Sequence, residues 1–165
     1  IGFGNIGKHV ARIANGIGME VLIYDMFDAA QDVLAEYNAK QTSVNHILKE
    51  CDFISIHVPL TENTKDMIST KEFKMMKDTA VLINAARGGI VNEYALYKAL
   101  KNKEIYACAS DVFTTEPPHR EPWVDELIKM DHFIQTAHIA SRSVESEINT
   151  VNTATNIMIQ LLQDP

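Results

Sequence analysis

Apolar residues recur along this chain in two patterns, helical spacing and short continuous runs. Helical spacing is clear from Ile6 to Ile17, where apolar side chains return every three or four positions, and the apolar run from Met19 to Tyr24 follows it. The same alternation continues to the end of the chain. It predicts helices over residues 29–37, 44–48, 69–76, 92–100 and 143–163, and strands over residues 52–58, 79–84, 105–112 and 133–139.

The predicted strands are nearly continuous in apolar character and alternate with helices. Both features are typical of an α/β protein with a doubly wound parallel sheet that is covered on both faces. Only Ile1-Gly2-Phe3 precedes the first turn, so we expect the first strand to be N-terminally truncated. The last predicted helix carries an apolar ridge from Val144 to Leu162, which we expect to be buried or to form an inter-domain or inter-subunit surface.

Three glycines, Gly2, Gly4 and Gly7, lie in the turn before the first predicted helix. Their GxGxxG spacing permits a tight turn, a close approach of the backbone to a pyrophosphate, and a helix N-terminus that faces the phosphate charge. Asp25 follows the next predicted strand, where a dinucleotide-binding fold places the acid that binds the adenosine ribose hydroxyls. We therefore predict a Rossmann-type fold that prefers NAD to NADP. The alternative for Asp25 is a solvated side chain at a strand end.

Composition and charge narrow the class of partner. A chain of 165 residues with 46% hydrophobic content can bury one sizeable core, so we expect one domain. Its net charge of −7 disfavours a nucleic acid or an anionic membrane as partner. The sequence has no apolar stretch near the ~20 residues of a membrane span and no signal segment at its start, so we expect a cytoplasmic protein. Cys51 lies beside a predicted strand and Cys108 lies in one, which favours reduced thiols.

Three candidate catalytic side chains follow predicted strands, where ligands of parallel sheets bind. Arg87 lies among small residues, which leaves its planar guanidinium free to bind a carboxylate. His138 ends the last predicted strand, and Glu116 is the carboxylate that we expect to orient its imidazole. Such a set can support hydride transfer to or from a nicotinamide. The alternatives are a surface salt bridge for Arg87 and a packing role for His138.

The remaining histidines are expected to be surface or packing residues: His9, His46, His57, His119 and His132. They lack paired ligand spacing, so we expect no metal site.

Five motifs occur in order along essentially the whole chain. They are the glycine turn with Tyr24-Asp25, His57-Val58-Pro59-Leu60-Thr61 with Thr64, Lys77 through Asn84-Ala85-Ala86-Arg87-Gly88, Asp111-Val112-Phe113 with Glu116-Pro117, and His138-Ile139-Ala140. In this order they resemble the D-isomer-specific 2-hydroxyacid dehydrogenases. Ala137 departs from the proline that this family commonly has before the histidine.

The resemblance implies an NAD-dependent oxidoreductase that transfers a hydride between NAD(H) and a D-2-hydroxy acid or 2-oxo acid. Arg87 matches the arginine that binds the acid's carboxylate, His138 the general acid/base, and Glu116 the carboxylate paired with it. Other positions match cofactor contacts, namely Asn5 and Ile6 at the pyrophosphate, Val58, Pro59 and Thr64 on the adenosine side, and Ala85, Ala86, Asp111 and Ala140 on the nicotinamide side.

The resemblance also implies what surrounds this chain. Residues 1–165 match the NAD-binding domain that carries the catalytic residues, and the family's substrate-binding domain is absent from them. We therefore expect the fragment alone to be inactive. For the complete enzyme we expect a homodimer that acts on a small-molecule 2-hydroxy or 2-oxo acid.

Alternatives of two kinds stay open, other enzymes of the family and a protein of another class. Within the family, Pro59-Leu60-Thr61 favours a phosphoglycerate, glycerate or hydroxypyruvate type over D-lactate dehydrogenases. Glu116 argues against formate dehydrogenases, which typically carry an amide there. An alternative of another class is an NAD-sensing protein-binding scaffold that resembles the C-terminal-binding co-repressors, which retain the arginine, glutamate and histidine.

Overall fold

The computed structural model describes residues 1–118 and 121–163, and His119 lies outside these ranges. Helices and strands alternate along the described chain, as the apolar pattern predicts. β1 (Val21–Ile23) pairs with β2 (Ala39–Gln41), and a second sheet has the order β3 (Phe53–Ile56), β4 (Val81–Asn84), β5 (Ala107–Ser110) and β6 (Phe133–Gln135). All of these pairs are parallel, so the carboxyl ends of the strands meet at one edge of each sheet.

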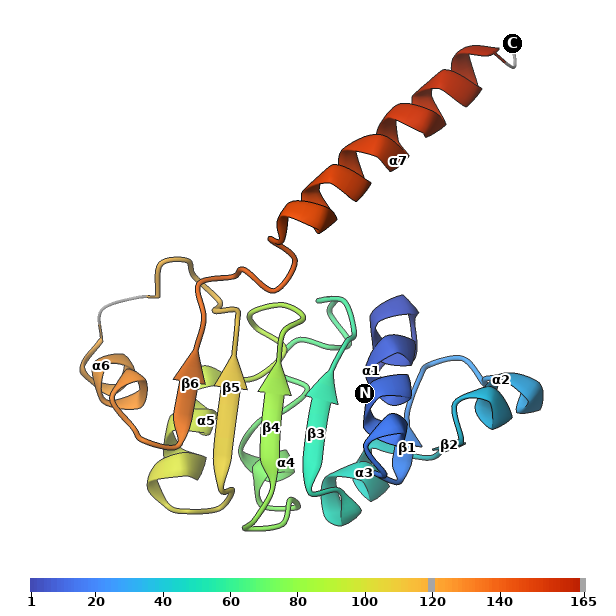
Figure 1. Cartoon of the computed structure of the whole chain (residues 1–165). Helices are drawn as coiled ribbons and strands as arrows, with labels where there is room; N and C mark the ends of the chain where they lie inside the picture. The colour runs from blue at the N-terminus through green and yellow to red at the C-terminus, as the bar shows by residue number, and fades with distance from the viewer. Residues whose placement is uncertain (119–120, 164–165) are drawn as a thin grey trace.

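Residues 1–3 join the two sheets at the place of a first strand. On one side the His57 N–H donates to the Ile1 carbonyl at 2.7 Å, and on the other the Gly2 N–H donates to the Tyr24 carbonyl at 2.7 Å. The chain start accordingly lies between β1 and β3 (Figure 1). The spatial order is β2, β1, residues 1–3, β3, β4, β5, β6, which is the order of a Rossmann-type sheet. The predicted fold class is confirmed, and residues 1–3 occupy the place of the first strand without forming a regular strand.

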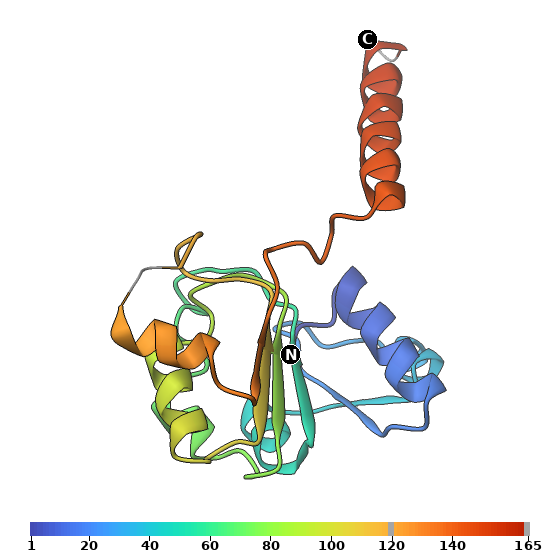
Figure 2. The same ribbon diagram turned by 60° about the vertical axis from the view of Figure 1, so that its left-hand side comes forward.

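Helices pack on both faces of the sheet, and more of them lie on one face than on the other. α4 (Thr70–Phe73), α5 (Glu93–Lys101) and α6 (Pro122–Ile128) lie on one face of the β3–β6 sheet, and α1 (Asn5–Gly16) lies on the opposite side near β1 (Figure 2). α2 (Gln31–Glu36) and α3 (Val44–Glu50) flank β2 in the chain. Local signals begin the helices as expected, since the Asn92 side chain accepts from the Ala95 N–H at 2.9 Å ahead of α5.

The main core lies between the β3–β6 sheet and α4–α6. Ile54, Leu82, Cys108 and Phe133 are neighbours in register and are all buried. The next residues along the strands are also neighbours in register, and their side chains point to the opposite face of the sheet. One of them, Ile134, is 66% exposed. Two others, Ser55 and Ile83, are half-buried, so this second face is less covered than the first in the described chain.

α7 (Val144–Gln163) projects from the body of the molecule (Figure 1). No side chain of α7 is buried against the rest of the described chain. The expectation that its apolar ridge is buried is thus not met within these residues, because the helix leaves the sheet after the turn that follows β6.

Several predicted boundaries differ from the observed ones. The strand expected over residues 133–139 ends at Gln135, since His138 has a backbone φ of 54°, which a strand does not allow. β2 was not predicted because Lys40 and Gln41 interrupt its apolar character. α6 was not predicted either, although Pro122 stands at its start, a position that suits proline.

Candidate active site

The glycine turn shapes the start of α1, and its three glycines differ in what surrounds them. A Cβ on Gly7 would lie 2.1 Å from the Gly2 carbonyl oxygen, and one on Gly2 would lie 2.7 Å from the His57 backbone. Gly2 also has a φ of +94°, which favours glycine. Gly4, in contrast, has nothing within 4 Å of an added Cβ in the described structure. Gly2 and Gly7 therefore serve packing, and Gly4 leaves open space at the helix N-terminus.

That open space lies beside backbone donors. Asn5 and Ile6 form the first turn of α1, whose leading N–H groups have no acceptor inside the helix. Both side chains are exposed. The turn thus offers unpaired N–H groups, the positive end of the helix dipole and room for an anion, which fits a pyrophosphate.

Asp25 lies at the meeting point of the glycine turn and the end of β1. Its Oδ2 accepts from the Phe3 N–H at 2.7 Å, and its Oδ1 accepts from the Phe27 N–H at 3.2 Å. These bonds hold the half-buried carboxylate beside the turn. A carboxylate accepts about four hydrogen bonds, so capacity for ribose hydroxyls remains.

The loop after β3 carries Val58, Pro59 and Thr64. The Thr64 hydroxyl donates to the Pro59 carbonyl at 2.6 Å and accepts from the Thr61 N–H at 2.8 Å. In this structure the Thr64 hydroxyl therefore stabilises the conformation of the loop. Val58 is half-buried and Pro59 exposed, at the same carboxyl edge as the glycine turn.

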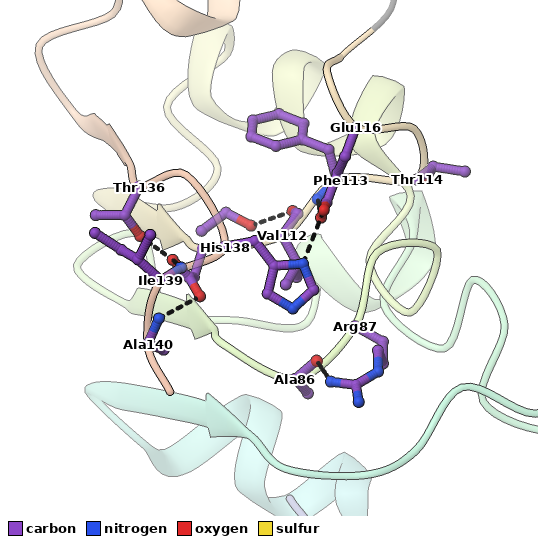
Figure 3. Close-up of polar contacts among 12 residues, drawn as sticks. Ala86, Arg87, Val112, Phe113, Thr114, Glu116, Thr136, His138, Ile139 and Ala140 are labelled. Atoms are coloured by element: carbon purple, nitrogen blue, oxygen red, sulfur yellow. Dashed lines mark hydrogen bonds and ion pairs between the residues drawn. The ribbon is translucent and has the colours of Figure 1, made fainter. Parts of the chain in front are cut away.

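Arg87 is exposed on the loop that follows β4, with Ala85 and Ala86 before it. Its Nη1 donates to the Ala86 carbonyl at 2.7 Å (Figure 3). The buried Asn84 braces this loop, because its amide donates to the Arg87 carbonyl at 3.1 Å and accepts from the Ala86 N–H at 3.2 Å. Asn84 was not among the predicted site residues, although a polar side chain that ends an apolar strand is a usable signal.

Gly88 brings this loop against the one that carries Glu116. A Cβ on Gly88 would lie 2.0 Å from the Phe113 carbonyl oxygen, so only glycine permits the approach. The Phe113 N–H in turn donates to Glu116 Oε1 at 3.2 Å. The loops of the predicted arginine and carboxylate are therefore packed together.

Glu116 and His138 are in direct contact, as the sequence analysis predicts. His138 Nδ1 and Glu116 Oε2 are 2.8 Å apart (Figure 3). The hydrogen bond from His138, followed by that from the Phe113 N–H, holds the pKa of Glu116 below its ordinary value. An ionised carboxylate only accepts, so we assign the proton of this bond to Nδ1, which leaves Nε2 to exchange a proton with a ligand.

Asp111, the nicotinamide-side candidate at the end of β5, is buried and holds the turn around His138. Its carboxylate accepts from the Thr136 hydroxyl, from the Ile139 N–H at 2.9 Å and from the Ala140 N–H at 3.0 Å. Burial opposes ionisation of this carboxyl, but the three hydrogen bonds outweigh it and lower its pKa. One acceptor position of the carboxylate remains for another donor.

A cavity of about 430 Å³ adjoins these groups. It lies between the loop of Phe113 to Pro118 and the turn of Gln135 to His138. His138 and Glu116 therefore border a space that can admit a small molecule.

The described residues also bear on three other features, namely a metal site, the two cysteines and a membrane-spanning helix. No cluster of three or more His, Cys, Asp or Glu residues able to hold a metal ion occurs among the described residues. Cys51 and Cys108 are both free, and burial raises the pKa of the Cys108 thiol to about 12. No described helix has the length and apolar character needed to cross a membrane.

A Rossmann-type sheet, a glycine turn open to a pyrophosphate, and a histidine–glutamate pair with an arginine on the adjoining loop define a dinucleotide-binding domain with a candidate acid–base site. The family model of the D-isomer specific 2-hydroxyacid dehydrogenase, NAD binding domain, matches residues 1–140. The chain belongs to this family, and it is an NAD-binding domain.

Relatives of known name agree with this assignment. Hydroxypyruvate reductase of Thermotoga maritima is 40% identical over 147 residues, which cover 89% of this chain and 46% of that protein. The NAD complex of a D-isomer specific 2-hydroxyacid dehydrogenase of Lactobacillus delbrueckii ssp. bulgaricus has a TM-score of 0.90 at 32% identity, covering 99% of this chain and 52% of that one. D-lactate dehydrogenase of Aquifex aeolicus, solved with NAD and lactic acid, has a TM-score of 0.86 at 32% identity, covering 98% and 52%. The chain thus spans about half the length of these relatives.

Proposed function

We propose that this chain is the NAD-binding and catalytic half of a dehydrogenase that interconverts a small D-2-hydroxy acid and its 2-oxo acid. The observation that carries the proposal is the 2.8 Å bond between His138 and Glu116, which leaves Nε2 available at the carboxyl edge of the sheet. Arg87 follows the strand β4 and Glu116 follows its neighbour β5, so the carboxylate anchor and the acid–base pair share that edge.

The proposed mechanism assigns one task to each side chain. Arg87 binds the substrate carboxylate with its guanidinium and so orients the C2 carbon. In the oxidising direction His138 Nε2 removes the hydroxyl proton, and the negative charge of Glu116 stabilises the imidazolium that forms. The bound nicotinamide supplies the acceptor for the C2 hydride. In reduction His138 returns the proton to the carbonyl oxygen.

Cofactor contacts are proposed for the residues around the open edge. The N–H groups of Asn5 and Ile6 and the space over Gly4 fit the pyrophosphate, and Asp25 fits the ribose hydroxyls. The proposed adenosine side comprises Val58, Pro59 and Thr64, and the proposed nicotinamide side comprises Ala85, Ala86, Asp111 and Ala140.

The proposed substrate is a short 2-oxo acid of the glyoxylate or hydroxypyruvate kind. Hydroxypyruvate reductase of Thermotoga maritima and glyoxylate reductase of Korarchaeum cryptofilum, at 40% and 42% identity, support this choice. We further propose that a substrate-binding domain outside these 165 residues completes the site and that the fragment alone is inactive. A cytoplasmic homodimer is proposed as well, and the two free cysteines fit a reducing compartment.

The test is steady-state kinetics of the full-length protein with NADH and a panel of glyoxylate, hydroxypyruvate and pyruvate. His138→Ala and Arg87→Ala should each lower kcat/KM by roughly 100- to 10,000-fold. NADH affinity of His138→Ala should stay within about twofold, because the lost group acts on the substrate. His132→Ala, a change at an exposed histidine near the amino end of β6, is the matched control.

Two results would contradict the proposal. Turnover of His138→Ala at the rate of the unchanged protein would remove the acid–base assignment. Tight NADH binding without turnover of any 2-oxo acid would favour a sensing scaffold over an enzyme.

A further inference from the structure

We propose that Thr136 is a positioning residue for the acid–base histidine, because its hydroxyl ties the turn of residues 136–140 to the Asp111 carboxylate. The inference rests on the proposed function, in which His138 moves the substrate proton. Thr136 bonds to the buried carboxylate and acts on the reaction through it.

The backbone of His138 needs to be held in place. Its φ of 54° lies in the left-handed region, which histidine visits only uncommonly. Such a conformation persists where surrounding contacts enforce it. One contact is the bond from the His138 N–H to the Asp111 carbonyl at 2.9 Å.

The Asp111 carboxylate holds the chain on both sides of His138. After the histidine, the Ile139 N–H donates to Oδ1 at 2.9 Å and the Ala140 N–H donates to Oδ2 at 3.0 Å. Before it, the Thr136 hydroxyl donates to Oδ1. Asp111 itself is buried at the end of β5, and these three bonds are partly buried.

Thr136 provides the only side-chain donor to this carboxylate among the described residues, since the other donors are backbone groups. Its own N–H donates to the Ser110 carbonyl at 3.1 Å and continues the pairing of β6 with β5. Only Ala137 separates this anchored residue from His138. Loss of the hydroxyl therefore removes the side-chain tie before the histidine, while the backbone bonds of Thr136 and His138 and the bonds after the histidine remain.

Loss of the Thr136 hydroxyl should change the position of the His138 imidazole. A rotation at His138 would lengthen the 2.8 Å bond between Nδ1 and Glu116 and would release the tautomer that this bond selects. Nε2 would then be misaligned for proton transfer, and small misplacements in an active site cost rate more than binding.

The experiment compares Thr136→Val and Thr136→Ser in the full-length protein. The valine variant should lower kcat by about tenfold or more with KM for NADH within about threefold, and the serine variant should keep kcat within about threefold of the unchanged protein. Long-range proton–nitrogen spectra with isotope-labelled histidine should show a single Nδ1–H form of His138 in the unchanged protein and the serine variant. They should show a mixture of tautomers in the valine variant.

Thr79→Val is the matched control, since it makes the same substitution at an exposed residue ahead of the amino end of β4. It should change neither kcat nor the His138 spectrum. If the valine variant does not fold, Thr136→Ala removes the hydroxyl without placing a second methyl beside the carboxylate, and it is measured in the same way.

Each outcome decides the matter. An unchanged kcat together with an unchanged tautomer, a loss that appears only in KM for NADH, or a loss that serine does not rescue overturns the positioning role. If His138→Ala itself keeps full turnover, the proposed function fails, and the tautomer alone then decides whether Thr136 positions the ring.

Discussion

At the residue scale, Asp25 shows how one carboxylate serves both local structure and a proposed selectivity. Its bonds to the Phe3 and Phe27 N–H groups hold it beside the glycine turn. A fixed negative charge at this point favours ribose hydroxyls and disfavours a phosphate group.

Asp25→Asn removes the charge and keeps an oxygen that can accept from the Phe3 N–H. We expect it to raise the ratio of kcat/KM with NADP to that with NAD by about tenfold, because the like-charge repulsion is removed. Steady-state kinetics with both cofactors measure the ratio. Asp28→Asn, at an exposed carboxylate of the same loop, should leave it unchanged. An unaltered ratio in Asp25→Asn would show that this carboxylate does not select the cofactor.

The residues proposed for chemistry could be chosen from the sequence because their types and their places after strands are informative. Arg87, Glu116 and His138 are of this kind. Asn84 was not assigned a role although its place at the end of an apolar strand was a signal, whereas nothing in the local pattern of Thr136 distinguishes a bracing side chain from a solvated one. Their partners, Ala86 and Asp111, are identified only by the folded backbone.

At the scale of elements, the start of α1 separates packing from cofactor binding. Gly7→Ala places a Cβ 2.1 Å from the Gly2 carbonyl and should destabilise the fold by about 1–3 kcal/mol or more. Gly4→Ala meets nothing within 4 Å in the described structure and should cost less than about 1 kcal/mol of the free energy of unfolding.

The same Gly4→Ala change should weaken NADH binding by about tenfold, which corresponds to about 1.4 kcal/mol. Urea unfolding and NADH fluorescence measure the two effects, and full NADH affinity in Gly4→Ala would argue against a pyrophosphate over this turn.

The end of β3 carries a pH-sensitive histidine with no proposed role in chemistry. In the 165-residue chain, burial, followed by the charge of the amino group at Ile1, lowers the pKa of His57 from 6.5 to about 4, and its Nε2 lies 2.8 Å from the Ser55 hydroxyl. The unfolded chain therefore binds a proton near pH 6.5, which the folded chain does not bind until about pH 4.

Stability should consequently fall between pH 6.5 and about 4 and should be unaffected by His57 above this range. The loss should be about 1–3 kcal/mol, since the ring is only half-buried. His57→Gln should flatten this part of the profile, and His46→Gln, at an exposed histidine of α3, should not. Urea unfolding at a series of pH values measures the difference, and parallel profiles for His57→Gln and the unchanged protein would refute the assignment.

The longer elements could be predicted because their apolar period is repeated over many residues. β2 was missed, since three residues with a polar half provide no period to detect. Strand ends were overestimated for a different reason. An apolar pattern continues through Val112 and Ile139, but the chain leaves the sheet before them to form the site loops.

At the scale of the whole molecule, the two faces of the β3–β6 sheet differ. Ile54 is 1% exposed beneath the helices, whereas Ile134 is 66% exposed on the other face. Together with α7, this face leaves apolar surface in contact with solvent in the described chain.

Because the two sheet faces differ in exposure, the same substitution should lower the free energy of unfolding by different amounts on the two faces. Ile54→Ala should destabilise the 165-residue chain by about 2–5 kcal/mol, and Ile134→Ala by less than about 1 kcal/mol. Urea unfolding of the two variants measures these values, and each serves as the other's control. Equal losses would mean that something covers the second face in solution.

The sequence by itself determined the alternation of helices and strands, the glycine turn and the ordered motifs that define the family, because these depend on spacing along the chain. Only the tertiary structure decided that Gly88 lies against Phe113, that Asp111 binds the turn around His138, and that one sheet face is less covered than the other. The physical reason is that parallel strands bring residues that are far apart in sequence to one edge. The bonds they make there depend on backbone angles, such as the positive φ of His138, that no local pattern specifies.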